Sequence, residues 1–72
     1  MTKIFKLNEI DCPICAAKAE KYAKKVNGVE EVSVDYITQK MIVDAESFSD
    51  EIIDELILAV KKVDPDCEAT EA

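Results

Sequence analysis

The chain has 72 residues, 49% hydrophobic and 35% charged, which is typical of one small folded domain rather than of a disordered segment. Its formal net charge of −7 argues against nucleic-acid binding, because that function needs clustered basic side chains. The longest apolar run is too short to cross a bilayer, and the N-terminal residues MTKIFKLNEI lack the apolar core of a signal peptide. We therefore expect a cytoplasmic, monomeric protein without direct membrane insertion.

The first half of the chain predicts a strand followed by a helix. Residues 3–8 alternate around Phe5 and Leu7, as in a strand with one buried face. From about Ile14 the spacing becomes helical, and Asn27-Gly28 is a suitable end for that helix. The apolar stripe of the helix consists of Ala16, Ala19, Ala23 and Val26.

The second half predicts two further strands and a second helix. Residues 32–36 and 41–45 have strand character, and Ser47 with Asp50 fits a capping box at the start of the second helix. Apolar residues then recur at helical spacing until Pro65.

A short final strand at residues 66–70 completes the order strand–helix–strand–strand–helix–strand. This order predicts an α+β, ferredoxin-like βαββαβ sandwich, in which two helices cover one face of a four-stranded antiparallel sheet. One domain is expected to fill residues 1–72.

The segment DCPICA, residues 11–16, carries the chemistry. Cys12 lies in the loop and Cys15 near the start of the first helix, so the two sulfur atoms can converge on one point. A helix N-terminus lowers the pKa of nearby thiols, and both metal binding and thiol redox chemistry need thiolates. With no histidine in the chain, any metal site must be built from sulfur and oxygen.

Asp11 favours metal over redox chemistry. A carboxylate beside two thiolates opposes the ionisation that a redox dithiol needs, whereas it suits a divalent ion such as Zn²⁺, Cd²⁺ or Pb²⁺. Cu(I) prefers sulfur alone and is less favoured. Three ligands, Asp11, Cys12 and Cys15, leave the site open, as metal transfer requires. The alternative for Asp11 is that it only caps the helix.

Other residues near the site have simpler interpretations. Cys67 is expected to be a small buried apolar residue rather than a third thiolate. Asp64 fits a solvated turn better than a source of charge outside the ligand shell. Ile10 and Ile14 are expected to shield the site and to pack beneath it.

Taken together, these features resemble the heavy-metal-associated domain over nearly the whole chain, from DCPICAAKAEKYAKKVNGVEEVSVDYITQKMIV to VKKVDPDCEAT. The resemblance implies the ferredoxin-like fold, with the metal held by Cys12 and Cys15. The DCxxCA form is similar to the N-terminal domains of zinc-, cadmium- and lead-exporting P-type ATPases, which implies that Asp11 is also a ligand. Copper members typically carry Gly-Met where this chain has Glu9-Ile10.

The leading hypothesis is therefore a binding module, not an enzyme. It would capture a soft or borderline metal ion, most favourably Zn²⁺, and pass it to or within a cation-transporting P-type ATPase, in cis or in trans. One alternative is a glutaredoxin-like oxidoreductase, in which Cys12 is the nucleophile and Cys15 the resolving thiol. Another is an interaction module whose CxxC sequence is incidental.

Overall fold

The computed structural model describes residues 1–8, 10 and 12–72, and six secondary-structure elements lie in this part of the chain. They are β1 (Thr2–Lys6), α1 (Pro13–Lys24), β2 (Val29–Asp35), β3 (Lys40–Ala45), α2 (Asp50–Val63) and β4 (Thr70–Glu71). The predicted order of strands and helices is confirmed.

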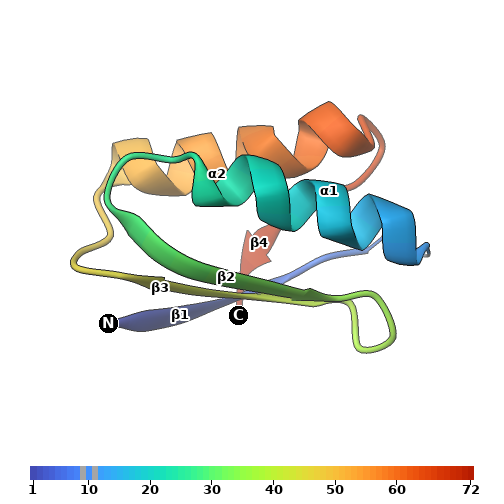
Figure 1. The fold of residues 1–72 in the computed structure, drawn as a ribbon, viewed down its shortest axis with the longest axis horizontal. Helices are drawn as coiled ribbons and strands as arrows, with labels where there is room; N and C mark the ends of the chain where they lie inside the picture. The colour runs from blue at the N-terminus through green and yellow to red at the C-terminus, as the bar shows by residue number, and fades with distance from the viewer. Residues whose placement is uncertain (9, 11) are drawn as a thin grey trace.

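The strands form one antiparallel sheet in the order β2-β3-β1-β4. β1 lies between β3 and β4, and its Ile4 is the cross-strand partner of Ile42. Both helices cover the same face of the sheet (Figure 1). This is the predicted ferredoxin-like sandwich.

The core fills the space between the sheet and the two helices. Alternate strand residues such as Phe5, Met41 and Val43 are fully buried beneath the helices. α1 contributes only alanines to its buried stripe, and side chains this small let the helix backbone approach its neighbours closely. α2 adds the larger side chains Leu56 and Val60.

Several predicted boundaries are wrong by a few residues. The N-cap of α2 is Ser49, whose hydroxyl accepts a hydrogen bond from the Ile52 N–H at 3.3 Å, so the capping box predicted at Ser47 does not form. The first strand ends at Lys6 rather than at residue 8. The last strand begins at Thr70 rather than at residue 66.

The predicted end of the first helix at Asn27-Gly28 is also wrong. α1 ends at Lys24 with Lys25 as its C-cap, so the helix stops before the predicted pair. Gly28 does have a positive φ of 94°, the left-handed conformation that favours glycine, but it uses this conformation in the connection to β2.

The turn between β2 and β3 is held by Asp35. Its carboxylate accepts hydrogen bonds from the N–H groups of Ile37 and Thr38, at 2.8 and 3.4 Å. These backbone hydrogen bonds, above all the one from Ile37, lower the pKa of Asp35. Gln39 ends the turn with a φ of 58°, a left-handed conformation that is uncommon for a side chain of its size.

Candidate metal centre

Cys12 occupies the N-cap position of α1. Its backbone is extended, with φ −140° and ψ 134°, and its Sγ accepts a hydrogen bond from the Cys15 N–H at 3.4 Å. Its carbonyl accepts the first helical bond, from Ala16 N–H at 3.0 Å. Pro13 follows at the first helical position, where the missing N–H costs nothing and the fixed φ suits the helix. Cys12 and Cys15 therefore lie one turn apart at the start of a helix, as the sequence predicted.

The N-cap position bears on the alternative interpretation of Asp11. The residue at the N-cap position is Cys12, and the alternative that Asp11 caps the helix concerns a side chain outside the described residues, so it stays open. Asp11 itself lies outside the described residues, so its predicted role as a ligand stays a prediction.

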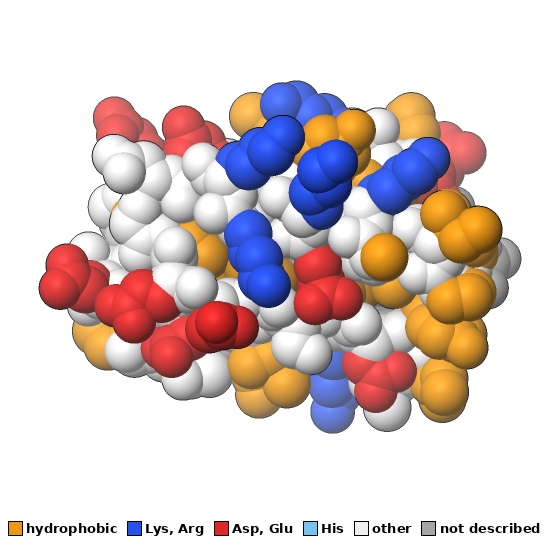
Figure 2. Space-filling view, in the orientation of Figure 1, with side chains coloured by type: hydrophobic (Ala, Val, Ile, Leu, Met, Phe, Trp, Pro, Cys, Tyr) orange, Lys and Arg blue, Asp and Glu red, His pale blue; other side chains and the backbone are white. Residues whose placement is uncertain are grey.

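Among the described residues, Cys15 packs against the apolar core. Both cysteines are partly buried, and Ile10 packs into the core beneath the loop with 0% exposure. Ile14 is 67% exposed, so the prediction that it packs beneath the site is wrong. Its position just inside the helix N-terminus directs it outward, because the buried stripe of α1 begins only at Ala16. Figure 2 shows apolar side chains gathered at the end of the molecule where α1 begins.

The loop that carries the cysteines is tied to two distant segments. The Asn8 side-chain carbonyl accepts a hydrogen bond from the Glu68 N–H at 2.8 Å, which joins the loop to the segment before β4. On the other side, the Leu7 N–H donates to the Gln39 carbonyl at 2.8 Å, and the Gln39 side chain bonds to both backbone groups of Ile10. The sequence interpretation missed Asn8 and Gln39, because a polar residue in a turn carries no signal of its own.

The acidic and thiol groups farther along the chain take structural roles. Cys67 is 0% exposed, which agrees with its interpretation as a small buried apolar residue. Asp64 is the C-cap residue of α2, and its carboxylate accepts a hydrogen bond from the Asp66 N–H at 3.0 Å, as expected for a turn residue. Within residues 1–8, 10 and 12–72, no three Cys, Asp or Glu side chains form a cluster able to hold a metal ion. Asp11 lies outside these residues.

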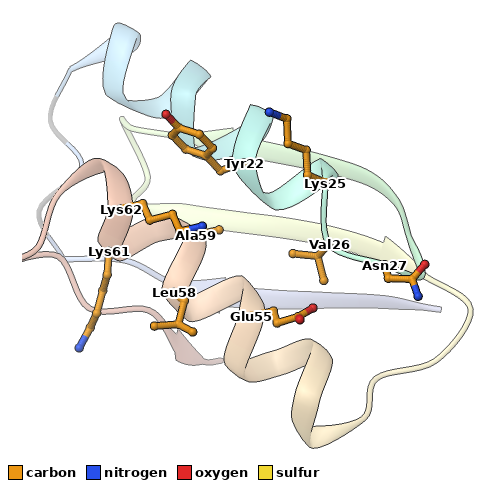
Figure 3. Close-up of a pocket in the computed structure, with 9 residues that line it drawn as sticks. All are labelled: Tyr22, Lys25, Val26, Asn27, Glu55, Leu58, Ala59, Lys61 and Lys62. Carbon is orange, nitrogen blue, oxygen red and sulfur yellow. The ribbon is translucent and has the colours of Figure 1, made fainter.

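A separate groove lies between the two helices (Figure 3). It is lined mainly by apolar and basic side chains, together with Asn27 and Glu55, and neither cysteine contributes to its wall. Tyr22 and Leu58 are exposed along it, and the Lys25 ammonium lies 5.8 Å from the centre of the Tyr22 ring. Lys61 and Lys62 add positive charge from α2. The groove is therefore distinct from the cysteine loop.

Comparison with known families identifies the chain. The family model of the heavy-metal-associated domain matches residues 4–65, which is most of the chain. The chain belongs to the heavy-metal-associated domain family. As a member it is a heavy-metal-binding domain, and the resemblance seen in its sequence is confirmed.

Solved structures agree with this assignment. The N-terminal domain of ZntA in its Zn(II) form is 27% identical with a TM-score of 0.80, covering 97% of this chain and 89% of that one. A structure from work on crosstalk between Cu(I) and Zn(II) homeostasis is 25% identical, with a TM-score of 0.79 over 100% and 99% of the two chains. A copper-binding domain from HMA7, a P-type ATPase, shares the fold at 20% identity and a TM-score of 0.78 over 99% and 92%.

The comparison with curated protein sequences found no match for this heavy-metal-associated domain. Among the residues that the structure describes, neither helix is long and apolar enough to span a membrane.

Proposed function

We propose that this heavy-metal-associated domain binds one divalent ion, with Zn²⁺ favoured over Cu(I), through Cys12, Cys15 and Asp11. The observation that carries the proposal is the position of Cys12 as the N-cap of α1, with Cys15 in the first turn. Their sulfur atoms lie at a helix N-terminus, where backbone N–H donors and the helix dipole favour thiolate over thiol.

The preference for a divalent ion rests on the donor set. Two thiolates and one carboxylate match zinc, which accepts mixed sulfur and oxygen ligands, and Cd²⁺ and Pb²⁺ fit the same reasoning. The likeness to the Zn(II) form of the ZntA domain supports this preference. Cu(I) remains the less favoured ion, because it gains little from a carboxylate ligand.

The metal is cargo in this proposal. A site with three protein ligands leaves a coordination position at which a partner's thiolate can attack before the first ligand leaves. The recipient or donor would be a cation-transporting P-type ATPase, either in the same polypeptide or as a separate partner. The domain, spanning residues 1–72, would act as a monomer on the cytoplasmic side of the membrane and would not be an enzyme.

A metal titration of the reduced protein tests the site. Zn²⁺ and Cd²⁺ are expected to bind with one ion per chain, and Cys12→Ser or Cys15→Ser should abolish stoichiometric binding. Asp11→Ala should weaken Zn²⁺ by at least about tenfold and leave Cu(I) nearly unchanged, because only the divalent ion uses the carboxylate. Asp54→Ala, an exposed carboxylate on α2, is the matched control and should change neither affinity.

Two results would contradict the proposal. Unchanged Zn²⁺ affinity in Asp11→Ala would remove the aspartate from the ligand set, while stoichiometric binding in Cys12→Ser would place the metal elsewhere. A glutathione-dependent reductase assay tests the redox alternative. Activity that disappears in Cys12→Ser would support a glutaredoxin-like function instead.

A further inference from the structure

The Gln39 side chain connects the β2–β3 turn to the cysteine loop. Its Oε1 accepts a hydrogen bond from the Ile10 N–H at 3.0 Å, and its Nε2 donates to the Ile10 carbonyl. The same Nε2 donates to the Tyr36 carbonyl at 2.6 Å, within the turn. One amide group therefore satisfies both backbone groups of Ile10 while its own turn holds it in place.

The position of Ile10 makes this contact relevant to the metal site. Ile10 lies two residues before Cys12, and its side chain is fully buried in the core. Figure 1 shows the β2–β3 turn at the same end of the sheet as the start of α1. Ile10 therefore has few conformations available, because its backbone is hydrogen-bonded to Gln39 and its side chain is packed in the core.

The backbone conformation of Gln39 argues against a role that is limited to stabilising the β2–β3 turn. A φ of 58° is tolerated far better by glycine or asparagine than by a residue with a longer side chain. A turn selected only for stability would therefore favour those residues. Glutamine is long enough to reach the neighbouring loop from this turn, as its bonds to Ile10 show.

We propose that Gln39 is a positioning residue for the metal site. Through its bonds to both backbone groups of Ile10, it holds the loop between β1 and α1 in the shape that presents the metal ligands. This inference rests on the proposed binding of metal by Cys12 and Cys15. Gln39 does not touch the metal in this account.

The expected effect follows from preorganisation. If the loop loses the Gln39 contact, only a fraction of molecules hold the binding conformation, and the apparent affinity falls by that fraction. Mutating a residue that orients a metal ligand by a hydrogen bond typically lowers metal affinity by about 10- to 100-fold. Because Gln39 acts through Ile10 rather than on a ligand, we expect a loss near the lower limit, about tenfold.

Two variants separate positioning from stability. Gln39→Asn shortens the side chain by one methylene, so it withdraws the amide from Ile10 while suiting the left-handed backbone better. Its melting temperature should stay close to that of the parent protein, because the better backbone fit offsets part of the lost hydrogen bonding, whereas its Zn²⁺ affinity should fall about tenfold. Gln39→Glu keeps the length but replaces the donor with an oxygen facing the Ile10 carbonyl, so it should also weaken Zn²⁺ binding.

The measurement is competition with a chromophoric chelator for Zn²⁺ at fixed pH, combined with thermal melting of the apo protein. Ile37→Ala is the matched control, because Ile37 lies in the same turn with its side chain 78% exposed, and it should retain parental affinity. Hydrogen exchange at the Ile10 N–H should accelerate in Gln39→Asn and not in Ile37→Ala.

Failure of the Gln39 inference can be distinguished from failure of the proposed metal site. If both Gln39 variants bind Zn²⁺ as the parent does while Cys12→Ser loses binding, Gln39 stabilises only the turn, and this inference is overturned alone. A Gln39→Asn variant that is partly unfolded at the assay temperature, with Gln39→Glu unaffected, would also overturn it. Full binding by Cys12→Ser would overturn the proposed site and this inference together.

Discussion

At the scale of single residues, Cys12 combines two roles. Its sulfur accepts the Cys15 N–H as the helix cap, in a position that serine, threonine, aspartate and asparagine usually occupy. The proposed metal would bind the same atom. The cap therefore fixes the direction of the sulfur before the ion arrives, and the two roles can be separated by changing the capping atom.

Serine and alanine at position 12 should have different effects on stability. Cys12→Ser replaces sulfur with a preferred capping oxygen, so the free energy of unfolding of the apo protein should be unchanged or slightly higher. Cys12→Ala removes the cap and should lower it by about 1 kcal/mol. Both variants should lose Zn²⁺ binding. Chemical denaturation checks stability, and equal stability of the two variants would show that Cys12 does not cap α1.

At the scale of elements, the start of α2 is set by Ser49 rather than by Ser47. Ser49 has an extended backbone and accepts the Ile52 N–H, and Asp50 and Glu51 place negative charge in the first turn, where the helix dipole favours it. Ser47 lies two residues too early to reach those N–H groups. The helix therefore begins later than the capping-box pattern indicated.

A pair of matched alanine substitutions tests this boundary. Ser49→Ala should lower the free energy of unfolding by about 1 kcal/mol, because an N–H of the first turn loses its acceptor. Ser47→Ala is the control and should stay within about 0.5 kcal/mol of the parent, as exposed substitutions usually do. A larger loss in Ser47→Ala than in Ser49→Ala, measured by urea denaturation, would contradict the assigned start of α2.

The sequence predicted regular elements better than the contacts between them. Strand alternation around Phe5 and the alanine stripe of α1 are periodic, so the element order and fold class followed from them. The cysteine pair was likewise visible from its spacing and its place before a helix. The Gln39–Ile10 and Asn8–Glu68 contacts join loops that lie far apart in the sequence, so no local pattern reports them.

At the scale of the whole molecule, the candidate site depends on the complete fold. Asn8 bonds to Glu68, 60 residues away, and Leu7 bonds to Gln39. The β1–α1 loop, the β2–β3 turn and the segment before β4 therefore meet at the end of the sheet where α1 begins (Figure 1). The unfolded chain cannot hold its cysteines in this way. Metal binding should consequently stabilise the folded state, because the binding free energy is available only after folding.

X-ray absorption of the Zn²⁺-loaded, reduced protein tests the central claim most directly, because it reports the atoms bound to the metal. We expect two sulfur ligands at about 2.3 Å, from Cys12 and Cys15, completed by oxygen ligands at about 2.0–2.2 Å. Cys12→Ser should not retain one Zn²⁺ ion per chain, so this two-sulfur shell should be absent from the variant. Three or more sulfur ligands would bring Cys67 or a second molecule into the site, and a shell without sulfur would contradict the account.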